Sequence, residues 1–196
     1  MKKKKSIFRE SIEVVLTAFL LAFAIKIFVA ELYKIPSGSM RPTLMEGDRI
    51  VVVKFIYGPR IPFINIHLPG FRQPRRGEII VFKAPDSPNK VFIKRLAAGE
   101  GESVEISNGK LLINGKPVDN PPPFRTVYYY NQGKYGREER AIHVPKDSYF
   151  VLGDNSASSR DSRYWGFVPK NYVIGKAVLI IWPPKRIQLI YDRQSK

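Results

Sequence analysis

The chain has 196 residues, no cysteine and a formal net charge of +16 at pH 7. Its length suits one domain, or one domain carrying a smaller inserted one, with enough residues to bury a core. The lack of cysteine excludes disulfides, thiolate zinc sites and cysteine nucleophiles. With only His67 and His143 as histidines, we expect neither a metal centre nor a cofactor. The positive charge indicates an anionic partner, either nucleic acid or anionic lipid.

The N-terminal segment predicts a transmembrane anchor. An almost entirely apolar run extends from Ile12 to Ala30. About 19 residues at roughly 1.5 Å each span about 28 Å, close to the thickness of the hydrocarbon core. Lys26 interrupts the run near its far end, where its long side chain can reach the interface. The basic residues before the run predict a cytoplasmic N-terminus, with everything after Ala30 outside; they are Lys2, Lys3, Lys4, Lys5 and Arg9.

A cleaved secretory signal is an alternative, because its apolar region has a similar size. Cleavage after Ala30 would place the large side chain of Phe28 where a small residue is needed, and Ala22-Phe23-Ala24 lies inside the apolar run. We therefore expect a cytoplasmic basic segment at residues 1–10 and an uncleaved anchor at residues 11–31. A buried core helix is a further alternative, which the flanking lysines disfavour.

The rest of the chain predicts a mainly β fold with curled sheets. Short runs rich in β-branched residues recur, and Gly, Pro, Asn and Asp separate them. Asn108-Gly109 and Asn114-Gly115 are typical of hairpin turns. Helical periodicity is not evident beyond the anchor. The expected strands are 50–55, 78–82, 91–96 and 103–106, with the runs KLLING, SYFVLG and KAVLIIW.

Two segments interrupt the strand pattern. Residues 57–76 predict either an apolar loop that enters the lipid or a loop folded over the core, and their large apolar side chains include Phe63, Ile64, Ile66 and Phe71. Residues 103–146 predict a small, solvent-facing inserted lobe. The extracytoplasmic core would then comprise residues 32–102 and 147–196.

The stretch IPSGSMRPTL, Ile35 to Leu44, presents Ser39 between a flexible glycine and two stiffening prolines. Rigid presentation suits a nucleophile, although prolines and serines also build ordinary turns. A nucleophilic serine needs a base. His67 and His143 both lie in the interrupting segments, and neither has a carboxylate partner in a suggestive motif.

Lysine is the alternative base. In the run VFIKRLA, strand alternation places Phe92, Lys94 and Leu96 on one face. If that face is buried, desolvation lowers the pKa of Lys94 and provides a neutral amine near pH 7. The competing interpretation is a lysine on a solvated strand face.

The stretch GDNSASSRDSRYWGFVP, Gly153 to Pro169, is rich in turn formers, hydroxyls and alternating charges. It directly follows the apolar run YFVL. The apolar residues YWGFV within it favour a loop folded against the core over a charged surface loop. Its charged residues can pair with one another or with Arg95; they are Asp154, Arg160, Asp161 and Arg163.

Together these stretches resemble the bacterial type I signal peptidases, membrane-bound Ser-Lys proteases that release exported proteins from their signal peptides. The matching pieces, in family order, are the anchor, SGSMRPTL, GDRIVVVKFIYG, RGEIIVFKAP with VFIKRL, and GDNSASSRDSRYWG. The SGSMxPT and GDNxxxSxDSR patterns are intact. The resemblance implies curled antiparallel sheets with a small inserted β lobe. One anchor is present here, whereas many Gram-negative members have two.

The resemblance also implies roles for individual residues. Ser39 would be the nucleophile and Lys94 the general base. Ser37 would supply a hydroxyl to the oxyanion hole, beside the backbone N–H of Ser39, and Ser159 would hydrogen-bond the Lys94 amine and orient it.

Structural ion pairs and substrate pockets complete what the resemblance implies. Arg95 would pair with Asp154, and Asp161 with Arg163. Shallow pockets for small side chains imply cleavage after an Ala-x-Ala-like sequence. The residues expected to line them are Ile35, Pro36, Met40, Phe92 and Ile93.

The sequence therefore predicts a single-pass serine endopeptidase of the bacterial inner membrane, which acts on preproteins at an anionic bilayer and binds no nucleic acid. Two alternatives stay open. A self-cleaving repressor-type Ser-Lys protease would carry an N-terminal DNA-binding domain, where this chain has an anchor. A non-catalytic anchored β domain would hold Ser39 in an ordinary turn.

Overall fold

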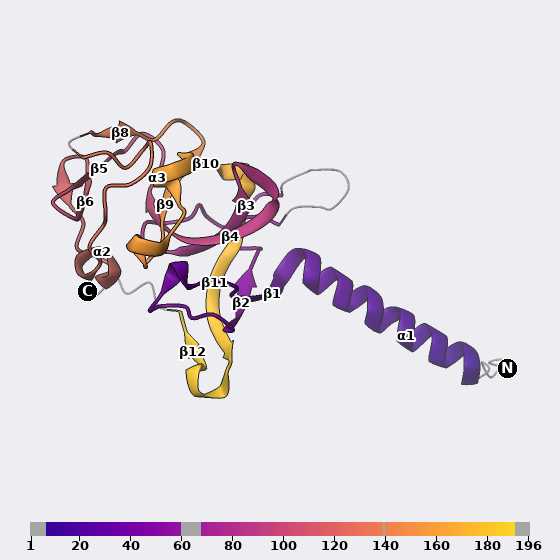
Figure 1. Cartoon of the computed structure of the whole chain (residues 1–196). Coiled ribbons are helices and arrows are strands. Elements are labelled where there is room, and N and C mark those ends of the chain that lie inside the picture. The colour runs from indigo at the N-terminus through magenta and orange to yellow at the C-terminus, as the bar shows by residue number, and fades with distance from the viewer. Residues whose placement is uncertain (1–6, 60–67, 139, 191–196) are drawn as a thin grey trace.

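The computed structural model describes residues 7–59, 68–138 and 140–190 (Figure 1). A long N-terminal helix, α1 (Ile7–Ala24), projects from a body built of two antiparallel sheets. The described shorter helices are the one-turn α2 (Pro122–Thr126) and α3 (Ser162–Trp165). Most of the body is strand and turn, so the mainly β fold expected from the sequence is confirmed.

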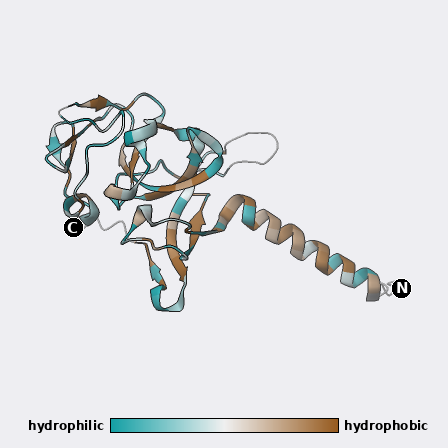
Figure 2. Ribbon diagram, viewed as in Figure 1, coloured by the Kyte–Doolittle hydropathy of each residue, from teal (hydrophilic) through white to brown (hydrophobic). Residues whose placement is uncertain are grey.

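Helix α1 continues into a π-helical turn, Ile25–Val29. Together they form a helix, Phe8–Val29, that is long and apolar enough to cross a membrane, with a mean hydropathy of 2.4. None of its most apolar window packs against the body. Figure 2 shows that hydrophobic residues extend along its length. A helix this apolar and unpacked is typical of a membrane span. The expected anchor ended at residue 31, whereas the helix ends at Val29 because Ala30 begins a strand.

The larger sheet follows the order β1-β2-β11-β3-β4-β9-β10, with β12 paired to β11. Its pairs are antiparallel, and register shifts in β4 and β11 bend it, as bulges do. Its strands are β1 (Ala30–Lys34), β2 (Arg49–Val53), β3 (Ile79–Ala84), β4 (Ser87–Ala98), β9 (Ser148–Leu152), β10 (Val168–Pro169), β11 (Val173–Trp182) and β12 (Gln188–Leu189).

Strand β1 was not expected from the sequence. Its residues, AELYK, directly continue the apolar run, so the anchor pattern concealed the change of structure. The strand forms because Ala30 to Lys34 pair in continuous register with β2. Strand β1 therefore connects the end of the helix rigidly to the segment that contains Ser39.

The second sheet has the order β7-β6-β5-β8 and lies within residues 103–146. Its turns are those predicted: Asn108 and Gly109 have φ angles of 49° and 74°, and Asn114 and Gly115 have 52° and 74°. Positive φ at both central residues is the signature of a tight hairpin turn. The strands are β5 (Ser103–Ser107), β6 (Lys110–Ile113), β7 (Lys116–Pro117) and β8 (Ile142–His143).

The second sheet shares a hydrophobic core with the first. Val104, Ile106 and Leu111 pack in one cluster with Ala97 of β4 and Phe150 of β9. Residues 103–146 were expected to form a small, solvent-facing inserted lobe. Their sheet buries one face against the main sheet, because strands this short cannot enclose a core alone.

Part of the expected apolar loop, including Phe63, Ile64 and Ile66, lies outside the described residues. Its base is closed by a hydrogen bond from the Leu68 N–H to the Pro59 carbonyl, 3.0 Å long. Beyond it, Phe71 is 83% exposed and meets the Phe55 ring edge-on. Whether the loop enters lipid stays a prediction.

Candidate active site

Ser39 lies on a single 3₁₀ turn, Gly38–Met40, which follows β1. The Ile35 N–H donates to the Asp48 carbonyl at 2.8 Å, so the chain leaving β1 stays bound to the chain entering β2. The Leu44 N–H donates to the Met40 carbonyl at 2.9 Å. Ser39 is 8% exposed, and the turn therefore holds its side chain in a fixed, largely desolvated position.

Lys94 reaches this serine from the middle of β4. Its Nζ lies 2.7 Å from Ser39 Oγ and 2.9 Å from the Ile93 carbonyl oxygen. The amine also sits over the Phe92 ring, 5.8 Å from its centroid. Lys94 is 4% exposed, so the solvated strand face considered from the sequence is excluded.

Burial changes the acid–base behaviour of Lys94. Desolvation lowers the pKa of its amine to about 8, while the carboxylates of Asp161 and Asp154 act in the opposite direction. Desolvation dominates because these carboxylates are bound to arginines. A neutral amine 2.7 Å from a hydroxyl can accept its proton.

Two buried ion pairs hold the loop that follows β9. Arg95 meets Asp154 through two hydrogen bonds, Nε–Oδ1 at 2.8 Å and Nη2–Oδ2 at 2.6 Å, and both side chains are 1% exposed. Arg163 forms a similar bidentate pair with Asp161, Nε–Oδ1 at 2.8 Å and Nη2–Oδ2 at 2.9 Å. Asp161 also accepts from the Gly153 N–H at 3.0 Å. Bidentate pairs fix the relative orientation of the two side chains as well as neutralising their charges.

Ser159 lies in this loop beside the catalytic candidates. A Cβ atom on Gly153 would lie 2.5 Å from the Ser39 carbonyl oxygen and would also collide with Ser159 Oγ. Within the described part of the chain, the buried Ser159 Oγ has no hydrogen-bond partner. The structure therefore brings Ser159 to the site without forming the expected hydrogen bond to Lys94.

Asn155, for which no role was expected, binds the serine turn at two points. Its Nδ2 donates to the Gly38 carbonyl at 3.0 Å, and its backbone N–H donates to the Ser39 carbonyl at 3.1 Å. Thr43 was also missed, and its hydroxyl donates to Asp154 at 2.5 Å. Their positions inside the GDN and SGSMRPT motifs were the only sequence signal.

A shallow apolar cleft lies beside the serine turn. Of the five expected pocket residues, Ile35, Pro36, Phe92 and Ile93 line it. Met40 does not, because the 3₁₀ turn directs it into the core, where it is completely buried. Ser37 is exposed at the start of the turn, and its side chain does not cap it.

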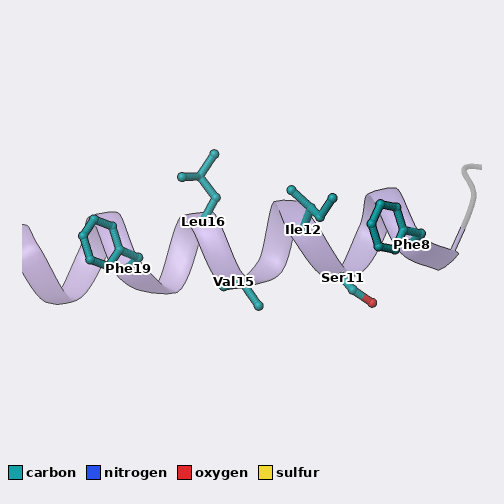
Figure 3. Close-up of a pocket in the computed structure, with 6 residues that line it drawn as sticks. All are labelled: Phe8, Ser11, Ile12, Val15, Leu16 and Phe19. Carbon is teal, nitrogen blue, oxygen red and sulfur yellow. The ribbon is translucent and has the colours of Figure 1, made fainter.

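Two other candidate features lie away from Ser39. A larger hollow runs along α1 and is lined only by residues of that helix, five of them apolar (Figure 3). It belongs to the surface of the long apolar helix and lies outside the site at Ser39. His143 is exposed on β8 of the second sheet, and His67 lies outside the described residues, so no described histidine serves Ser39 as a base.

Comparison with known proteins identifies the family of this chain. A family model described as signal peptidase, peptidase S26, matches residues 8–182. The chain belongs to this family. Among signal peptidase relatives, signal peptidase I of Leptolyngbya laminosa is 38% identical over 94% of this chain and 85% of that protein. Signal peptidase I of Pseudomonas aeruginosa is 34% identical over 85% of this chain and 70% of that protein. A crystal structure of a signal peptidase I from Enterococcus faecalis is 33% identical, covers 54% of this chain and 97% of that chain, and superposes with a TM-score of 0.45.

Proposed function

We propose that this protein is a membrane-bound serine endopeptidase that removes N-terminal signal peptides from exported preproteins. The observation that carries the proposal is the 2.7 Å contact between Lys94 Nζ and Ser39 Oγ in a buried site. The pair occurs in a chain of the signal peptidase family, which favours this function over a repressor-type protease or a non-catalytic anchored domain.

The proposed reaction begins with the neutral Lys94 amine, which accepts the Ser39 hydroxyl proton as Oγ attacks the scissile carbonyl carbon. The tetrahedral intermediate then collapses. The peptide C–N bond breaks, and the Lys94 ammonium returns its proton to the leaving amine of the mature protein. An ester between the signal peptide and Ser39 remains. Lys94 next deprotonates a water molecule, which hydrolyses the ester and restores the free serine.

The oxyanion of the intermediate needs donors that are already in place. The Ser39 N–H is one proposed donor. It belongs to the same planar peptide group as the Gly38 carbonyl, which Asn155 Nδ2 holds at 3.0 Å. Fixing that carbonyl also fixes the N–H, which points the opposite way across the peptide plane. The exposed Ser37 supplies the second donor from its hydroxyl.

Ser159 is proposed as a positioning residue for the base. An unpaired buried hydroxyl costs about 1–3 kcal/mol, which a hydrogen bond to the Lys94 amine would relieve. Arg95–Asp154 and Arg163–Asp161 hold the loop that carries it. The narrow cleft lined by Ile35 and other apolar side chains suits small residues before the cut, as in Ala-x-Ala.

The proposed location is the bacterial inner membrane, with the N-terminus in the cytoplasm and the β body outside. Ser39 lies nine positions after Ala30, at most about 30 Å of extended chain, so the nucleophile stays near the outer surface. A signal peptide held in the bilayer presents its cut site there. The charge of +16 favours anionic headgroups as the surrounding lipid.

Two substitutions test the proposed dyad on a purified preprotein. Ser39→Ala removes the nucleophile and should lower cleavage by about 10⁶-fold, the scale seen when a catalytic serine is removed. Lys94→Met keeps the volume but removes the base, and should lower the rate by at least about 10²–10⁴-fold. Product masses report both the rate and the cut site.

Ser107→Ala and Lys83→Met serve as matched controls, since both residues are partly buried on strands outside the site. Both should cut at the wild-type rate. Full cleavage by either dyad variant would refute the mechanism and favour the non-catalytic alternative.

A further inference from the structure

Within the described chain, α1 passes into the β body without a linker. The π-helical turn ends at Val29, and Ala30 already has extended backbone, with φ −151° and ψ 157°. Ala30 is also the first residue of β1 and lies opposite Val53 of β2. In Figure 1 the helix leads directly to the edge of the larger sheet. The direction of the helix is therefore set by the contacts made at this junction.

Lys54 connects the two sides of the junction. It directly follows β2, and its backbone N–H donates to the Val29 carbonyl at 2.9 Å. Its Nζ donates to the Lys26 carbonyl in the π-helical turn at 2.9 Å. The same Nζ pairs with Glu31 of β1 at 2.7 Å, and the Lys54 side chain is only 13% exposed. One ammonium group thus joins the helix end, the first strand and the second strand.

The chemistry of this position explains why a cation suits it. The last carbonyls of a helix lack donors within the helix, and a positive charge there also interacts favourably with the helix dipole. Near lipid, where water is scarce, such a donor stabilises more than it does in solvent. Tyr33 steadies the arrangement by donating to Glu31 at 2.9 Å.

The junction is rigidly connected to the nucleophile. Strand β1 pairs with β2 along its whole length, from Ala30 opposite Val53 to Lys34 opposite Arg49. The serine turn begins four residues after Lys34. A change of angle at the junction therefore moves Ser39 together with the sheet, relative to the bilayer.

We infer that Lys54 is a positioning residue that sets the height of Ser39 above the membrane and so selects which bond of a membrane-held preprotein is cut. This inference rests on the proposed function. It predicts that a substrate free in solution, which has no fixed height, does not sense the junction.

The test compares full-length Lys54→Gln with wild type in vesicles of phosphatidylethanolamine and phosphatidylglycerol. The substrates are preproteins with zero to three residues inserted between the apolar segment and the cut site, and a soluble peptide with the same cut site. Lys54→Gln should cut the peptide within about twofold of wild type. It should cut the natural-length preprotein about tenfold more slowly, and its preferred insertion length should change, because small misplacements of reacting groups cost up to about 10²-fold.

Lys83→Gln is the control, since Lys83 lines the same small pocket as Lys54 but extends from β3. It should behave as wild type in both assays. An unchanged insertion preference in Lys54→Gln would overturn the inference, as would equal losses on the peptide and the preproteins. A wild-type enzyme that cuts neither substrate would refute the proposed function itself, a result distinct from these two.

Discussion

At the scale of single residues, the site depends on a lysine that is kept away from water and from direct ion pairs. The carboxylates of Asp161 and Asp154 act to raise the pKa of Lys94, but each is already bound by an arginine. Desolvation therefore dominates and brings the pKa to about 8. An ordinary lysine, with a pKa of 10.5, would be almost wholly protonated at neutral pH and could not act as a base.

The pH dependence of peptide cleavage follows from this pKa. The neutral amine is the active form, so kcat/KM should rise about tenfold per pH unit below pH 7 and level off above about pH 9. Rates measured on a soluble peptide across this range, with circular dichroism as a check on folding, test the expectation. A flat profile between pH 6 and pH 9 would contradict Lys94 as the base.

The lowered pKa of Lys94 also makes the stability of the folded protein depend on pH. Because the folded pKa of Lys94 lies below its ordinary value of 10.5, the unfolded chain binds more protons between about pH 8 and pH 10.5. Burying the charged amine thus costs stability below pH 8. That cost should diminish as the pH rises through this window.

At the scale of elements, the site is formed where the serine turn, strand β4 and the loop after β9 pack together. Gly153 lies at the closest approach of the loop to the turn. Asn155 ties the same loop to the turn through hydrogen bonds to Gly38 and Ser39. The spacing of these two segments therefore determines the distance from Ser39 to the base.

Gly153→Ala should damage activity more than stability. The new methyl group would overlap the Ser39 carbonyl and the Ser159 hydroxyl, so the turn must shift. We expect a loss of about 1–3 kcal/mol in the free energy of unfolding and a fall of roughly 10²-fold in kcat/KM. Denaturant unfolding and peptide kinetics measure the two effects.

Gly99→Ala is the matched control, because the Cβ it adds approaches the Glu102 side chain only to 3.9 Å. It should retain nearly wild-type kinetics. Wild-type kinetics in Gly153→Ala would show that the loop and the turn are not packed as described.

At the scale of the whole molecule, one apolar helix and one β body have opposite solvent requirements. The helix Phe8–Val29 is unburied and apolar, whereas the body encloses its own cores. The two meet through β1 and the junction at Lys54. This arrangement suits an enzyme whose substrate is itself held in a membrane.

The proposed orientation can be tested by labelling, because the chain has no native cysteine. Lys3→Cys and Lys185→Cys are made separately and expressed in intact cells. A membrane-impermeant maleimide should label the chain carrying Lys185→Cys from outside, but label the one carrying Lys3→Cys only after the membrane is opened. The unsubstituted chain, which should never be labelled, is the control. Labelling of Lys3→Cys from outside would show that the proposed orientation is wrong.

The sequence by itself determined those features that depend on neighbouring residues. The apolar run predicted the long apolar helix, and Asn108-Gly109 with Asn114-Gly115 predicted the hairpin turns, because hydrophobicity and turn geometry are local properties. The motifs around Ser39 and Lys94 were also sufficient to suggest the family. They were not sufficient to show contact, since the two residues are 55 positions apart in the sequence.

Only the tertiary structure decided which groups meet. The burial of Met40, the hidden strand β1 and the core shared by the two sheets all depend on packing between distant segments. The bond from Asn155 to Gly38 joins residues 117 positions apart. Lys94 acquires its low pKa in the same way, because a lysine becomes a base only when the rest of the fold removes water from around it.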